Sequence, residues 1–129
     1  MNSTIPVLLY QYNGPRRNIG FILSPLYLHD AAEPDPEHML FIYDEDFIYI
    51  RPVIDKAFPL TDPLTGEEME VFDPCWDNPI LNDVWMRILE ELDQQLIGDP
   101  ELRVFLNQFT SWVKIWLESA DGIEITGNL

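Results

Sequence analysis

The sequence predicts an α+β fold, in which a small, mostly antiparallel β-sheet from the N-terminal half packs against a C-terminal helical hairpin. Two observations lead to this class. Apolar residues recur at helical spacing over residues 79–96 and again over residues 100–117. The first 75 residues instead hold short alternating runs, separated by proline, glycine and acidic turns. With 129 residues, of which 47% are hydrophobic, the chain can bury a core, so we expect a single domain over residues 1–129.

The helical pair has recognisable boundary signals. Asn78 before Pro79 is typical of a helix start, and Asp99 before Pro100 repeats the pattern. Between them, Gly98 is expected to end the first helix in a left-handed conformation. The expected apolar faces are Leu81, Val84, Trp85, Ile88, Leu89, Leu92 and Leu96 in the first helix, and Leu102, Phe105, Leu106, Phe109, Trp112, Val113, Trp116 and Leu117 in the second. Because the connection is short, the helices should be neighbours, antiparallel or sharply crossed.

The strand signals are shorter. Predicted strands cover residues 5–12, 19–23, 39–43, 47–51, 69–72 and 123–125. The clearest β-hairpin joins residues 39–43 to residues 47–51 through the acidic tip Asp44-Glu45-Asp46. The second helix is expected to end at Gly122, so that residues 123–125 form a final edge strand.

The charge is large and unevenly placed. The net charge is −16, and all 23 carboxylate side chains lie from Asp30 onward, whereas Arg16 and Arg17 precede them. Such a charge repels nucleic acid and anionic membrane surfaces, so we expect neither as a partner. It favours a basic protein or a cationic ligand.

Residue types that carry chemistry are present without a matching pattern. The possible metal ligands are Glu33, Asp35, Glu37 and His38, with His29 and Asp30 nearby. Their spacing does not match a calcium loop, and one cysteine with two histidines gives no zinc pattern. The sequence has no phosphate-binding glycine loop and no nucleophile motif around a serine or Cys75. We therefore expect a solvated acidic loop, no metal, no cofactor and no enzymatic activity.

The expected compartment is the cytoplasm. Cys75 is the single cysteine and cannot form an internal disulfide. The N-terminal residues lack the pattern of an export signal, and no apolar run approaches the ~18 residues of a membrane span.

Two acidic groups form the predicted partner-binding surface: Asp44, Glu45 and Asp46 at the hairpin tip, and Asp83, Glu90, Glu91 and Asp93 on the first helix. Three successive carboxylates repel one another, and carboxylates late in a helix oppose its macrodipole. The alternative is that they form an ordinary solvated face. A second apolar stripe on the later helix, Val104 and Ile115, is expected to be covered by the sheet in preference to facing a partner.

These observations indicate a small acidic binding protein that neutralises a basic protein partner. In size and charge the chain resembles bacterial toxin-neutralising immunity proteins, which implies an inhibitor that blocks the basic cleft of a nuclease-type toxin. A nucleic-acid mimic, a structural or adaptor subunit using the Val104 and Ile115 stripe, and a small enzyme are the alternatives. The sequence leaves the oligomeric state open.

Overall fold

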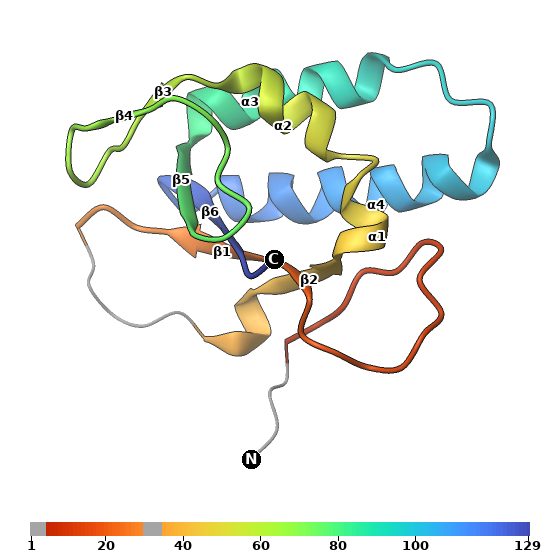
Figure 1. Ribbon diagram of the computed structural model, residues 1–129. Coiled ribbons are helices and arrows are strands. Elements are labelled where there is room, and N and C mark those ends of the chain that lie inside the picture. The colour runs from red at the N-terminus through yellow and green to blue at the C-terminus, as the bar shows by residue number, and fades with distance from the viewer. Residues whose placement is uncertain (1–4, 30–34) are drawn as a thin grey trace.

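A four-stranded antiparallel sheet and two long helices form the framework of the computed structural model, which describes residues 5–29 and 35–129 (Figure 1). The sheet has the order β2-β1-β6-β5. Its strands are β1 (Gly20–Leu26), β2 (Leu40–Tyr43), β5 (Asp77–Leu81) and β6 (Gly122–Gly127). The helices are η1 (Pro36–His38), α1 (Asp44–Phe47), α2 (Arg51–Ala57), α3 (Asn82–Gln94) and α4 (Pro100–Leu117), and β3 (Leu60–Thr61) pairs with β4 (Glu68–Met69) in a separate ribbon. The α+β class is confirmed.

The final strand occupies the interior of the sheet, which corrects the prediction of an edge strand. β6 pairs with β1 on one side and with β5 on the other. A Cβ atom built on Gly122 would lie 2.2 Å from the carbonyl oxygen of Ile80, so β5 approaches too closely for any residue but glycine. Alternation in residues 123–125 reveals one buried face, but it carries no information about how many strands lie alongside.

The hydrophobic core lies between one face of the sheet and the two long helices. Leu23 of β1 and Ile125 of β6 are paired in register and fully buried on that face. Trp85 of α3 is also fully buried, and its indole N–H donates to the carbonyl oxygen of Ile123 at 3.0 Å. Phe109 of α4 completes the contact, with its ring centroid 6.3 Å from that of Trp85.

Some residues of the predicted apolar faces lie outside this core. Trp112 and Trp116 are half-buried, and Leu96 is fully exposed because α3 has already ended before it.

The helix boundaries were predicted well for α4 and less well for α3. Asp99 caps α4 by accepting a hydrogen bond from the Glu101 backbone N–H at 2.9 Å, and Pro100 is the first helical residue. Pro79, however, lies inside β5, where an edge strand tolerates the missing N–H, and α3 begins three residues later. α3 ends at Gln94, and Gly66 is the one residue of the described chain with positive φ, so Gly98 is not a left-handed cap.

The end of α4 also differs from the prediction. The helix stops at Leu117, and Gly122 is the first residue of β6 instead of a helix terminus.

The predicted hairpin over residues 39–51 does not form. β2 is followed directly by α1 and α2, so residues 47–51 are not a strand. The buried side chains Phe47, Ile50 and Ile54 recur three and four residues apart, which is the helical period. The same short segment also fits the two-residue period of a strand, and tertiary packing decides between helix and strand.

The N-terminal segment covers the free edge of β2 without becoming a full strand. The Leu8 N–H donates to the Phe41 carbonyl oxygen at 3.0 Å, and the Phe41 N–H donates to that of Pro6 at 2.9 Å. Val7 forms an isolated parallel bridge with Phe41, so the predicted strand over residues 5–12 is reduced to one bridge. This contact shields the edge from pairing with other chains.

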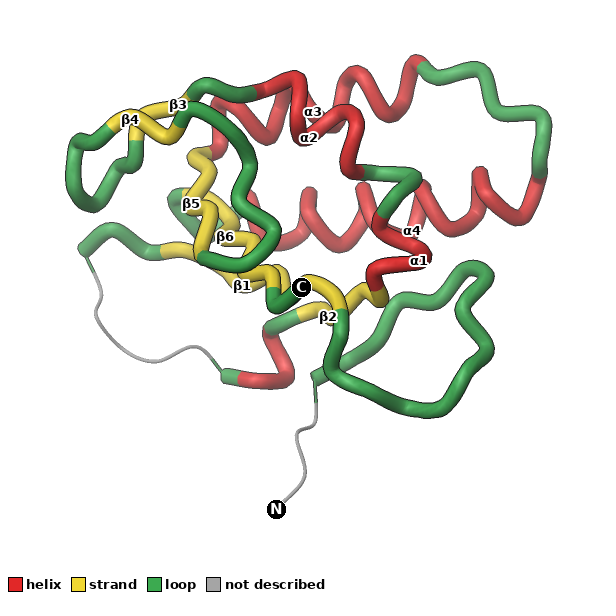
Figure 2. Tube along the Cα trace, viewed as in Figure 1, coloured by secondary structure: helices red, strands yellow, loops and turns green. Residues whose placement is uncertain are grey.

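Figure 2 shows long stretches without helix or strand before β1 and again before β5. The predicted strand over residues 69–72 retains only Met69 at the end of β4, although Phe72 is buried. Within residues 5–29 and 35–129, no helix is long and apolar enough to cross a membrane.

Candidate binding surface

The seven carboxylates predicted to bind a partner lie on two different elements. Asp44, Glu45 and Asp46 belong to α1, which packs against β1 and β2. The other four belong to α3, which packs against α2 and α4. The two groups therefore have to be judged separately.

Asp46 is an internal residue, which corrects the prediction of an exposed hairpin tip. Its side chain has no exposed surface. Oδ2 accepts the backbone N–H of Tyr10 at 2.9 Å, and Oδ1 accepts those of Gln11 at 2.8 Å and Tyr12 at 3.1 Å. A buried carboxylate that receives several N–H groups is a strong structural tether. Asp46 therefore fastens the N-terminal segment to α1 and is out of reach of a partner.

The rest of the α1 group is also partly engaged. Glu45 is exposed and pairs with Arg17, and the hydrogen bond from that guanidinium holds the pKa of Glu45 below its usual range. Asp44 is half-buried. The three successive carboxylates thus do not form one exposed triplet.

The α3 group faces solvent to a greater extent. Glu91 pairs with Lys56 of α2 at 2.6 Å, and Asp93 pairs with Lys114 of α4 at 3.3 Å, both with substantially exposed side chains. Such surface pairs contribute little and exchange partners readily. The group therefore remains accessible to a basic partner.

Asp83 and Glu90 carry the free charge of α3. Both are exposed, and neither takes part in an ion pair within the described chain. Their spacing of seven residues places them on the same side of the helix, about 10 Å apart along its axis. Asp83 lies in the first turn of α3, where the macrodipole favours a negative charge, whereas Glu90 lies in the later half, where it does not. Glu90 is thus the carboxylate of this group that folding explains least.

The basic side chains cannot balance this charge. The chain has seven lysines and arginines against 23 carboxylates, and all seven lie in the described ranges. Four of them form the ion pairs of these ranges, and Arg103 instead donates to the backbone carbonyl of Gln95 at 2.5 Å. Most carboxylates therefore depend on solvent, or on a bound partner, for compensation.

The predicted apolar stripe is exposed, contrary to the expectation that the sheet covers it. Val104 and Ile115 expose 55% and 61% of their surface. They are eleven residues apart on α4, so they lie about 16 Å from each other and do not form one patch.

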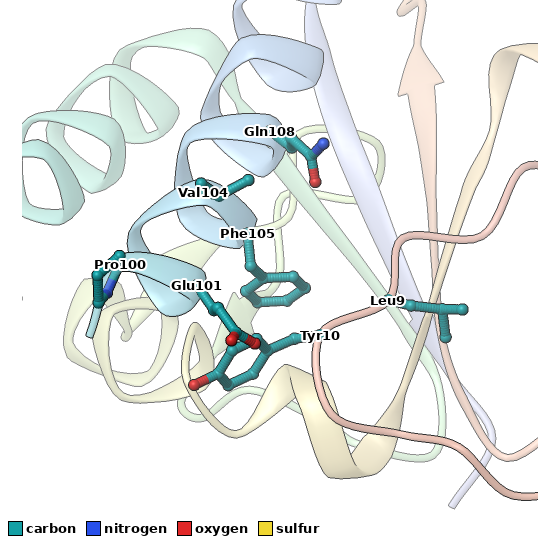
Figure 3. Close-up of a pocket in the computed structure, with 7 residues that line it drawn as sticks. All are labelled: Leu9, Tyr10, Pro100, Glu101, Val104, Phe105 and Gln108. Atoms are coloured by element: carbon teal, nitrogen blue, oxygen red, sulfur yellow. The ribbon is translucent and has the colours of Figure 1, made fainter.

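An open cleft of about 310 Å³ lies beside Val104 (Figure 3). In it, Phe105 of α4 points toward Tyr10 of the N-terminal segment. The cleft is lined by Leu9, Tyr10, Pro100, Glu101, Val104, Phe105 and Gln108. The Tyr10 hydroxyl donates to Asp99 at 2.6 Å, and this hydrogen bond raises the pKa of Tyr10 to about 12. This tyrosine lines the cleft and joins the N-terminal segment to the start of α4.

The outer face of the sheet, opposite the helices, holds an acidic cluster that the sequence analysis missed. Glu124 of β6 is half-buried there, and Asp77 lies diagonally across on β5. Partial burial, followed by the charges of Asp77 and Asp62, raises the pKa of Glu124 to about 7. The alternation of residues 123–125 already points Glu124 away from the core, but only the strand register brings Asp77 beside it.

A second feature missed from the sequence is the loop before β5. Trp76 lies in this loop and exposes 69% of its surface, between Asp73 and Asp77 in the chain. Because Asn78-Pro79 has the local pattern of a helix start, the sequence indicates for this segment only the approach to a helix.

The possible metal ligands are not gathered into a site in the part that the structure covers. Asp30 and Glu33 lie outside the described residues. Asp35 accepts the backbone N–H of Glu37 at 2.9 Å, and the ring of His38 lies 4.7 Å from that of Trp116. No group of three or more His, Cys, Asp or Glu side chains within residues 5–29 and 35–129 could hold a metal ion.

No protein-family model, curated protein sequence or solved structure matches the chain.

Proposed function

We propose that the protein is a small acidic binding protein that neutralises a basic protein partner, and that the exposed side of α3 is a principal contact. The carboxylates of this contact are Asp83, Glu90, Glu91 and Asp93, with Glu45 of α1 as an accessory. Asp46 is not part of the contact because it is buried.

The observation that carries the proposal is the surplus of exposed carboxylates on α3 after internal pairing. Lys56 and Lys114 each engage one carboxylate of the helix, and Asp83 and Glu90 form no ion pair within the described chain. Glu90 gains nothing from the helix macrodipole. Because folding does not require this charge, its best explanation is a partner that binds it.

The partner class that fits this surface best is a nuclease-type toxin. Nucleases hold phosphates in basic clefts, and a rigid acidic helix competes for the same side chains while attracting the partner over a long range. The protein would then act as an immunity or inhibitor protein in the cytoplasm of a bacterium.

The proposal can be tested by capturing the partner and then assaying it. A tagged parent protein is incubated with lysate of its source organism at low salt, and bound proteins are eluted with increasing salt. We expect a basic protein that leaves at high salt and has nuclease activity, which added parent protein inhibits.

Two matched variants make the assay specific. Asp83→Asn/Glu90→Gln removes two charges from α3, and Glu67→Gln/Glu68→Gln removes two exposed charges at the start of β4. Weaker capture by the α3 variant alone supports the proposal. Equal capture by both variants, or a captured protein whose nuclease activity is unaffected, contradicts it.

A further inference from the structure

Trp76 is unusual among the tryptophans of the chain. It exposes 69% of its surface, whereas Trp85 is fully buried and Trp112 and Trp116 are half-buried. Single exposed apolar side chains are common, but tryptophan is the residue most enriched among those that dominate binding energy at protein interfaces. The surroundings of Trp76 decide which reading applies.

The side chain of Asn78 holds the loop that carries Trp76 through hydrogen bonds to its backbone. This side chain is 1% exposed, and its Nδ2 donates to the carbonyl oxygens of Asp73 at 2.8 Å, Trp76 at 3.1 Å and Ile125 at 3.0 Å. Its Oδ1 accepts the Asp73 N–H at 2.8 Å. One buried amide thus fixes both ends of the loop to each other and to β6.

The end of β6 and the residues after it hold the same loop through backbone hydrogen bonds. The Gly127 N–H donates to the Trp76 carbonyl oxygen at 3.1 Å, and the Leu129 N–H donates to that of Pro74 at 3.2 Å. A Cβ atom on Gly127 would lie 2.1 Å from the Pro74 carbonyl oxygen, so the two segments are in close contact. The loop backbone is therefore ordered before any partner arrives, which lowers the entropic cost of binding.

Carboxylates lie within this rigid loop and on the neighbouring strand β6. Asp73 and Asp77 flank Trp76 in sequence, and Thr126 fixes Asp77 by donating to its Oδ1 at 2.8 Å. The charges of Asp77 and Asp62 both reach Glu124 on β6, so several carboxylates share this side of the molecule. None of them belongs to an ion pair of the described chain. Trp76 is therefore an exposed indole in a loop whose carboxylates form no ion pair within the described chain, and the face of such an aromatic ring can bind a cation.

We propose that the Trp76 loop, residues 73–77, receives an arginine side chain of the basic protein partner, with the guanidinium stacked on the indole and its charge balanced by Asp73 and Asp77. The inference rests on the proposed function, because it assigns a second contact to the same partner. Arginine is preferred over lysine because its planar, weakly hydrated guanidinium stacks on aromatic rings.

The test uses oligo-arginine and oligo-lysine peptides of equal length as probes, with isothermal titration calorimetry at moderate salt. Both peptides are attracted by the net charge, so the informative quantity is the ratio of their affinities. For the parent protein we expect oligo-arginine to bind roughly fivefold more tightly than oligo-lysine. In Trp76→Ala this ratio should fall to about one, and in Trp76→Phe it should be intermediate.

Two controls keep the result interpretable. Val71→Ala changes another exposed apolar residue just before the loop and should leave the ratio unchanged. Circular dichroism shows whether each variant is folded, and Trp76→Phe retains an aromatic ring if Trp76→Ala does not fold. A parent protein without arginine preference, or a folded Trp76→Ala variant whose ratio is unchanged, overturns the inference.

The outcome is separable from that of the proposed function. Loss of arginine preference in Trp76→Ala supports the loop as a cation site whether or not a toxin is captured. Capture and inhibition that depend on α3, with an arginine preference that is independent of Trp76, would retain the proposed function and overturn this inference alone.

Discussion

Asp46 and Glu90 are both helical carboxylates, and they have opposite roles. Asp46 in α1 is fully buried and accepts hydrogen bonds from three consecutive backbone N–H groups, those of Tyr10, Gln11 and Tyr12. Glu90 in α3 is exposed and has no ion-pair partner in the described chain. The difference is that the N-terminal segment covers Asp46, whereas Glu90 faces solvent. The comparison teaches that a count of acidic residues overstates the surface open to a partner, because some of them hold the fold together.

The largest expected change in stability comes from replacing Asp46, the buried carboxylate of this pair. Asp46→Ala leaves three backbone N–H groups without their acceptor and frees the N-terminal segment, so we expect a loss of about 3 kcal/mol in the free energy of unfolding. Urea denaturation measures this change. As the matched control, Glu90→Ala should change the free energy of unfolding by no more than about 0.5 kcal/mol. Similar values for the two variants would show that Asp46 is not the tether described above.

Glu124 is intermediate between the buried Asp46 and the exposed Glu90, because it is half-buried and has carboxylate neighbours. Its pKa is raised from 4.5 to about 7. Between these pH values the folded state holds a proton that the unfolded state has released, so stability falls as the pH rises through this window and levels off above it. Glu124→Gln removes this dependence and should stabilise the protein above pH 7 by about 1–2 kcal/mol, after allowance for partial exposure.

Urea denaturation of the parent and Glu124→Gln at several pH values from 4 to 8 checks this prediction. The two proteins should be similar at the acidic end and diverge as the pH rises. Parallel pH profiles would mean that Glu124 ionises normally and that the outer face of the sheet is less crowded with charge than its register indicates.

The smallest effects distinguish Asp83 from Glu90 within α3. Asp83→Asn should cost about 0.3 kcal/mol, because it removes a favourable charge from the first turn, whereas Glu90→Gln should gain a similar amount in the later half. Thermal unfolding at low salt gives the sign of each change, and added salt should reduce both. A stabilising Asp83→Asn would contradict the start of α3 at Asn82.

The sequence was sufficient to predict the fold class, the helical pair and the start of α4. These features depend on local signals, such as the apolar period and the Asp99-Pro100 cap. The start of α3 was misplaced because Asn78 and Pro79 have the same local pattern as a helix cap, although Asn78 is buried beneath a loop. The helices α1 and α2 were missed because Phe47, Tyr49 and Arg51 also fit a strand, and core packing makes the choice.

The candidate surface was only partly predictable for the same reason. Exposure of Asp83, Glu90 and Asp93 follows from the helical period, which the sequence displays. Burial of Asp46 depends on the N-terminal segment crossing over α1, more than thirty residues away in the chain. The exposure of Trp76 likewise depends on the long-range contact of its loop with Gly127, which no local pattern encodes.

The measurement that tests the central claim most directly is the rate of association with the captured basic partner. The parent is compared with Asp83→Asn/Glu90→Gln and with Glu67→Gln/Glu68→Gln, which has the same net charge, by surface binding kinetics at about 0.02 M and 0.5 M salt. We predict that the α3 variant associates several-fold more slowly than its charge-matched control at low salt, and that the difference nearly disappears at high salt. Equal association rates for the two variants at low salt would contradict the account, because net charge alone would then explain the attraction.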